Sequence, residues 1–113
     1  MNNNILKVTK VIDKLGIPAH IKGYRFLRDA VLMAIEDMSA LDYVTKEIYP
    51  TVAQKNNTTS SRVQRAIRHA IEVSLDRGDD EFKITLFGEN YRRKLTNSEV
   101  IATIADKIII EAL

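Results

Sequence analysis

The sequence contains no cysteine, which excludes disulfide bonds, zinc sites built from thiolates and a cysteine nucleophile. It also lacks a long apolar segment. The longest uninterrupted run, at 30–35, is far short of a membrane span, and the polar start at 1–4 has none of the apolar stretch of a secretory signal. Neither sign of charge is in clear excess, because the sequence has 17 basic and 15 acidic residues. We therefore expect a cytoplasmic protein with no membrane partner, and an anionic partner must be argued from where the charges lie.

What the chain does contain is ordinary for one globular domain. Its 113 residues, 45% of them hydrophobic, are enough to bury a core without covalent cross-links. Residues 81–88 alternate like a strand, but they are too few to decide between strand and helix. Apolar spacing elsewhere predicts helices at about 5–15, 23–39, 41–48, 51–56, 59–77 and from 96 onward, where Thr96 and Glu99 have capping-box spacing. The sequence predicts an all-α single domain, with either a helix or a small irregular hairpin at 81–88.

Residues 50–77 have the pattern of a helix-turn-helix, in which a short turn joins two helices at a sharp angle. Ala53 is small enough for the close approach of the helices, and Asn57 tolerates the left-handed backbone that such a turn requires. Val63 and Ala66 supply the buried side of the second helix. Because the same spacings occur in many helices, the charges of this segment must indicate its partner.

Residues 51–71 include four basic residues and no acidic one. Arg62, Arg65 and Arg68 or His69 follow one another at three- and four-residue spacing, which predicts that they share one face of the second helix. Guanidinium groups can bind guanine edges, while hydroxyls and free amides at the helix start can bind phosphate. Duplex DNA is the predicted partner. The alternative is a basic face that is only solvated.

Other polar clusters are weaker candidates for a site. His69 and Glu72 form at most half of a metal site, and we favour a phosphate or base contact for His69. The acidic residues around Gly78 lack the spacing of a calcium loop, so a solvated loop or a patch for a protein partner is favoured. The basic residues at 92–94 fit phosphate contacts and surface solubility equally well. Without a glycine-rich phosphate loop or a nucleophile elbow, an enzyme is disfavoured, and no cofactor or metal is expected.

Four segments carry a family resemblance: LGIPAHIKGY at 15–24, NTT with SRV at 57–63, RAIRHAIEV at 65–73 and TNSE at 96–99. On these segments the chain resembles the C-terminal DNA-binding effector domains of stage 0 sporulation protein A, the response regulator that starts sporulation. The resemblance extends over about 8–108.

This resemblance implies a six-helix domain whose fourth helix, at 59–77, enters the major groove of short boxes of the TGTCGAA type. It implies tandem head-to-tail binding, as a homodimer on adjacent boxes. It also implies contact of the region at about 77–88 with the sigma subunit of RNA polymerase, which favours a helix at 82–87. Together with the charge pattern, it predicts a DNA-binding surface made of Lys55, Thr59, Ser61, Arg62, Gln64, Arg65, Arg68 and His69.

The chain departs from the family pattern in three places. At Gln64 the family usually has glutamate, which suits the amino group of cytosine, whereas an amide pairs well with adenine, so we expect a shifted or relaxed box preference. Residues 74–95 match poorly, and an Ala-Trp pair of the family reads Ser74-Leu75 here. This motivates the alternative of a protein-interaction module that antagonises the sporulation regulator or RNA polymerase and binds DNA weakly. The receiver domain of the family, on the order of a hundred further residues, has no counterpart in the sequence, which fits either an excised effector domain or a stand-alone relative.

Overall fold

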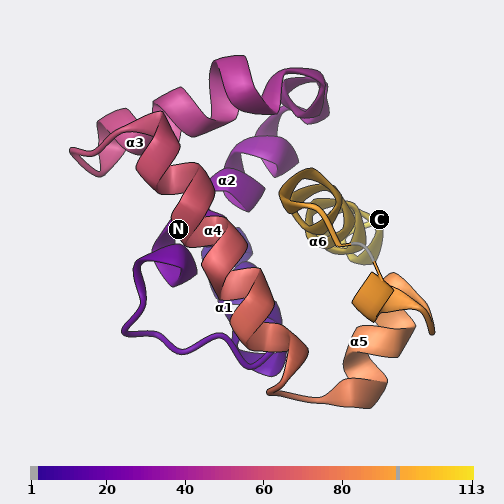
Figure 1. The fold of residues 1–113 in the computed structure, drawn as a ribbon. Coiled ribbons are helices and arrows are strands. Elements are labelled where there is room, and N and C mark those ends of the chain that lie inside the picture. Colours follow the sequence, from indigo (N-terminus) through magenta and orange to yellow (C-terminus); the bar gives the residue numbers. More distant parts are fainter. Residues whose placement is uncertain (1–2, 94) are drawn as a thin grey trace.

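Helices build the fold, and the described part of the chain contains no β-strand (Figure 1). The computed structural model describes residues 3–93 and 95–113. In chain order the elements are α1 (Asn3–Lys14), α2 (Lys22–Glu36), η1 (Met38–Tyr43), η2 (Val44–Ile48), α3 (Tyr49–Lys55), α4 (Ser60–Leu75), α5 (Asp80–Phe87), η3 (Tyr91–Arg93) and α6 (Asn97–Glu111). The predicted all-α architecture with six α-helices is confirmed.

The helix α2 is the centre of the packing, because it contacts α1, α3, α4 and α6. Its apolar residues recur every three or four positions and so face the core together. Leu27, Ala30, Val31 and Ala34 are fully buried. In Figure 1 α4 runs across the front of this core, which fixes the inner face of α4 and turns its other face outward.

Gly23 sets the distance between α2 and α4. A Cβ atom at this position would lie 2.3 Å from the carbonyl oxygen of Ala66 and 2.6 Å from Cβ of Ala70. Both distances are too short for any side chain, so the close approach of the two helices requires glycine. The orientation of α4 thus depends on a residue outside the helix-turn-helix.

The segment between α2 and α3 differs from the prediction. The predicted second helix runs to about residue 39, but α2 ends at Glu36 because Asp37 caps the following turn. The carboxylate of Asp37 accepts hydrogen bonds from the hydroxyl of Ser39 at 2.6 Å and from its backbone N–H at 3.0 Å. These bonds lower the pKa of the Asp37 carboxyl. The stretch predicted as a helix at 41–48 is helical, but it winds as a 3-10 helix and then a π-helix instead of an α-helix.

The two last helices begin at clear caps. Asp79 accepts a hydrogen bond from the backbone N–H of Phe82 at 3.1 Å, which starts α5 and makes the hairpin alternative wrong. At the start of α6 the predicted capping box is present. The hydroxyl of Thr96 accepts from the N–H of Glu99 at 3.1 Å, and the Glu99 carboxylate accepts from the N–H of Thr96 at 3.4 Å. Among the described helices none has the length and apolar character needed to cross a bilayer.

Candidate nucleic-acid interface

The turn between α3 and α4 contains the left-handed residue that the sequence predicts for a helix-turn-helix. Within it, Asn57 has a φ of 55° and is the one non-glycine residue of the described chain with a positive φ. Thr59 ends the turn as the N-cap of α4, because its hydroxyl oxygen accepts a hydrogen bond from the backbone N–H of Arg62 at 3.3 Å. This cap leaves the Thr59 hydroxyl proton and the first amides of α4 free to meet an anion.

The helix α4 has one buried face and one exposed face. Val63, Ile67 and Ala70 are fully buried against the core. Five predicted DNA-binding residues are exposed on the other side: Ser61, Arg62, Gln64, Arg65 and His69. Neither Arg62 nor Arg65 forms an ion pair with any carboxylate that the structure describes. The two guanidinium charges therefore have no counter-charge on the surface of the domain itself.

Arg68 stands apart from these two arginines. Its side chain is partly buried, and Nη1 donates a hydrogen bond to the backbone carbonyl of Leu95 at 2.6 Å. Its Nε is buried and has no hydrogen-bond partner among the described residues. Because an α-helix turns about 100° per residue, Arg68 lies roughly 120° around the helix from Arg62. The side chain therefore contacts the body of the domain, and a DNA contact by Arg68 stays a prediction.

Lys55, at the end of α3, lies beside an acidic residue of α2. Its ammonium group is 3.5 Å from the carboxylate of Asp29, and the two side chains are 66% and 14% exposed. The side-chain amide of Asn56 donates to the same carboxylate at 2.9 Å. Because the Lys55 ammonium is largely exposed, water screens the pair and weakens it, so Lys55 remains able to approach a phosphate with part of its charge offset.

A groove of about 610 Å³ lies between α4, η2 and the start of α6. Four of the predicted DNA-binding residues line it, namely Ser61, Gln64, Arg65 and Arg68. The others come from η2, from the first residue of α3 and from the start of α6: Thr45, Tyr49, Thr96, Asn97 and Ser98. The sequence does not predict these five as part of a site, because three separate segments supply them and only the tertiary fold brings them together.

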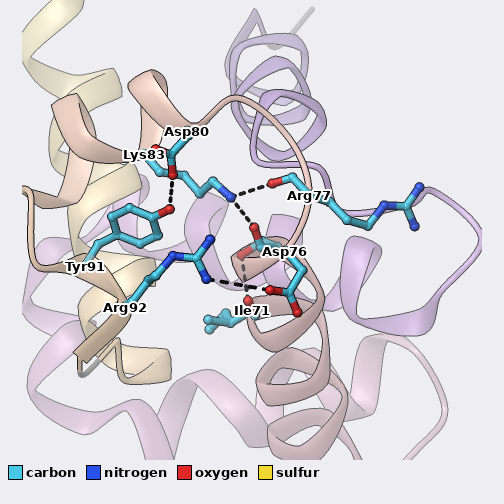
Figure 2. Close-up of polar contacts among 8 residues, drawn as sticks. Ile71, Asp76, Arg77, Asp80, Lys83, Tyr91 and Arg92 are labelled. Carbon is cyan, nitrogen blue, oxygen red and sulfur yellow. Dashed lines mark hydrogen bonds and ion pairs between the residues drawn. The ribbon is translucent and has the colours of Figure 1, made fainter.

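A cluster of polar contacts at the far end of α4 involves a residue that the sequence does not mark. Lys83 of α5 is 2% exposed, and its ammonium group donates to the backbone carbonyls of Ser74 and Arg77 (Figure 2). Burial lowers the pKa of Lys83, and the nearby positive charge of Arg92 lowers it further. A cation at the C-terminal end of a helix interacts favourably with the last carbonyls and with the helix dipole. Lys83 thereby fixes α5 to the C-terminal end of α4.

The acidic residues around Gly78 take part in this cluster. Asp80 accepts a hydrogen bond from the hydroxyl of Tyr91, which raises the pKa of Tyr91, and Asp76 lies 3.6 Å from the guanidinium of Arg92 (Figure 2). The described residues include no group of three or more metal-ligating side chains. Of the three basic residues at 92–94, Arg92 is paired on the protein, whereas the side chain of Arg93 and the whole of Lys94 lie outside the described residues.

A comparison with protein-family models agrees with this geometry. The model of the family "Sporulation initiation factor Spo0A C terminal" matches residues 8–108. The chain belongs to this family. The match includes the whole helix-turn-helix, the groove and the segment from α5 to α6, so the chain is a sporulation-related DNA-binding effector domain. This family is one of DNA-binding regulatory domains and not of enzymes.

Proposed function

We propose that this domain of the Spo0A C-terminal family is a sequence-specific transcription regulator that places α4 in the major groove of duplex DNA. The observation that carries the proposal is the outer face of α4, where Arg62, Gln64 and Arg65 are exposed beside a capped turn. These arginines form no ion pair with a described carboxylate. A rigid helix that presents unpaired guanidinium groups next to an amide suits the donor and acceptor pattern of base edges in the major groove.

The predicted contacts divide by chemistry. Arg65 and Gln64 contact base edges, since they extend from the middle of the exposed face. Ser61, Arg62 and the hydroxyl of Thr59 lie near the helix start, where phosphate contacts are most favourable. Lys55 and His69 contact the backbone at the two sides of α4. The first group determines which sequence is bound, and the others contribute affinity that depends on salt.

Further partners belong to the same proposal. Two copies of the domain would bind head to tail on tandem boxes. The sigma subunit of RNA polymerase would contact residues 77–88. Both interactions would take place at the nucleoid. Sedimentation of the domain with duplexes that carry one or two boxes tests the first point, since the two-box duplex should hold two copies. Binding of an isolated sigma subunit to wild type, compared with a variant altered at 77–88, tests the second.

The experiment that tests the main proposal starts with selection of bound duplexes from a random library. The affinity for the selected box is then compared with that for a scrambled duplex at physiological salt. We expect the box to bind tighter by a factor of about 10³ or more, as is typical of specific DNA-binding proteins. The variant Lys10→Ala is the control for the loss of one positive charge, because Lys10 is exposed on α1, outside the helix-turn-helix. It should distinguish the two duplexes as wild type does. If wild type fails to distinguish the two duplexes, the protein-interaction alternative takes the place of this proposal.

A further inference from the structure

The groove beside α4 has the chemistry of an anion site. It lies between α4, η2 and the first turn of α6. Arg65 and Arg68 contribute two guanidinium groups, and Thr45 and Ser98 contribute hydroxyls, while none of the described lining residues is acidic. A concave surface that gathers cations and hydroxyls without a carboxylate is complementary to a negatively charged group.

Arg68 gives the groove a fixed positive charge. Its guanidinium is partly buried and held by the carbonyl of Leu95 at 2.6 Å, yet it forms no ion pair within the described chain. A partly buried charge without a counter-ion loses hydration, and the single hydrogen bond to Leu95 compensates for only part of this loss, since the buried Nε has no partner among the described residues. An anion in the groove would restore this balance, and the bond to Leu95 holds the guanidinium in place before any ligand arrives.

Asn97 holds the walls of the groove together. It is 8% exposed, and its side-chain amide donates to the hydroxyl of Tyr49 and to the backbone carbonyl of Gln64, both at 3.1 Å. These two bonds tie the start of α6 to the start of α3 and to the middle of α4. The groove is therefore preorganised, so that a ligand need not order its walls on binding.

The first turn of α6 adds to the attraction for an anion. Thr96 is its N-cap, and Ser98 follows in the first turn with an exposed side chain, where the helix dipole favours negative charge. The one acidic residue of this turn, Glu99, does not line the groove. Its carboxylate accepts from the hydroxyl of Thr96 at 3.0 Å and from the N–H of Thr96 at 3.4 Å, so it is occupied in the capping box.

We infer that this groove binds a backbone phosphate of the DNA strand that borders the major groove, so that the footprint extends from α4 to the start of α6. The inference rests on the proposed function, because it takes DNA as the source of the phosphate. Ser61, Gln64 and Arg65 line the groove and also belong to the exposed face of α4. A phosphate in the groove would therefore lie beside the bases that α4 contacts. A phosphodiester of the same duplex meets this requirement, so no second ligand is needed.

The test is Ser98→Asp, which puts a negative charge into the groove. An acidic residue in the first turn of a helix is favourable, so the variant should keep its fold and its thermal stability. We expect the affinity for the selected box and for a scrambled duplex to fall by the same factor, roughly five- to tenfold, with a salt slope smaller by about one. The matched control is Thr85→Asp, because Thr85 is exposed on α5 in a different groove that shares no lining residue with this one.

Each result has a definite meaning. Equal losses on both duplexes, absent in Thr85→Asp, support the phosphate site. Unchanged affinity of Ser98→Asp, or a loss confined to the box, overturns the inference while the discrimination by wild type still supports the proposed function. Titration of wild type with inorganic phosphate, without DNA and at physiological ionic strength, separates the two sources of phosphate. Saturable stabilisation that Ser98→Asp abolishes would assign the groove to a free anion and overturn the assignment to DNA.

Discussion

The guanidinium of Arg68 donates a hydrogen bond to the backbone carbonyl of Leu95 at 2.6 Å, whereas Arg65, one turn earlier on α4, is exposed and forms no ion pair with a described carboxylate. Two arginines that look equivalent in the sequence therefore have different surroundings. Arg68 links α4 to the segment that precedes α6, and Arg65 is free to meet a ligand. The two positions can be separated by experiment.

Arg68→Ala should lower the stability of the domain. The change removes a hydrogen bond from a charged donor to a backbone carbonyl, which costs about 1.5–3 kcal/mol. Denaturant unfolding measures the loss. Arg65→Ala is the matched control and should stay within about 0.5 kcal/mol of wild type, as is usual for exposed positions. Equal stabilities of the two variants would show that the bond to Leu95 contributes nothing.

Lys55→Ala should weaken the binding of every duplex alike. Lys55 lies at the end of α3 and not on the face of α4 that we propose to contact bases, and the carboxylate of Asp29 at 3.5 Å offsets part of its charge. We expect equal factors for box and scrambled DNA and a salt slope smaller by at most about one. Fluorescence anisotropy at several salt concentrations gives both quantities. A larger loss on the box than on the scrambled duplex would make Lys55 a base contact instead.

Gln64→Glu should change the preferred sequence while leaving the fold intact. The side chain of Gln64 is exposed, and the contact that holds this position uses its backbone carbonyl, which accepts from Asn97 at 3.1 Å. A carboxylate only accepts hydrogen bonds and so favours the amino group of cytosine, whereas an amide suits adenine. Library selection with both proteins should show an adenine replaced by a cytosine at one position. Identical motifs would mean that Gln64 does not contact a base.

Lys83→Met should destabilise the end of α4. The substitution removes the ammonium donor from the carbonyls of Ser74 and Arg77, although the Ser74 carbonyl still accepts from the backbone N–H of Arg77 at 3.3 Å. Loss of a hydrogen bond from a charged donor costs about 1.5–3 kcal/mol. Lys10→Met is the control, because Lys10 is exposed on α1 and should tolerate the change. Chemical unfolding of both variants measures the difference. A stability of Lys83→Met equal to that of Lys10→Met would remove Lys83 as the link between α4 and α5.

Wild type and Lys83→Met should also differ in how their unfolding free energies depend on pH. The sign of this difference follows from the lowered pKa of Lys83. The unfolded chain keeps this proton to a higher pH than the folded chain, so the stability of wild type rises with pH through the interval that ends near the ordinary lysine value of about 10.4. Lys83→Met lacks this contribution. The difference in unfolding free energy, wild type minus variant, should therefore grow as pH approaches that value.

The sequence predicts most of the fold, because apolar spacing and caps act locally. The turn at Asn57 and the capping box of Thr96 and Glu99 are short-range features, and both are present. The type of helix at 38–48 cannot be predicted in this way, since the choice among 3-10, α and π winding depends on packing that the apolar spacing does not encode. For 81–88 the sequence leaves strand and helix both open, because the apolar residues alternate over too few positions to decide. The sequence does not reveal that Lys83 lies buried between them.

The candidate site also has a part that local sequence features predict and a part that depends on long-range packing. The exposed face of α4 follows from helical periodicity and from the local excess of basic residues, so Ser61, Arg62 and Arg65 could be predicted. The different surroundings of Arg68 depend on Leu95, which is 27 residues away in the chain. The wall formed by Asn97 and Ser98 depends equally on the way α6 packs. These long-range contacts carry no signal in a single sequence.

The ratio of affinities for the selected box and a scrambled duplex, measured for wild type and Arg65→Ala at one fixed salt concentration, tests most directly whether α4 contacts base edges. If Arg65 contacts a base, its truncation costs about 1–3 kcal/mol on the box and less on the scrambled duplex, so the ratio falls. A ratio that stays at the wild-type value, with both affinities lowered equally or not at all, would contradict sequence recognition by Arg65.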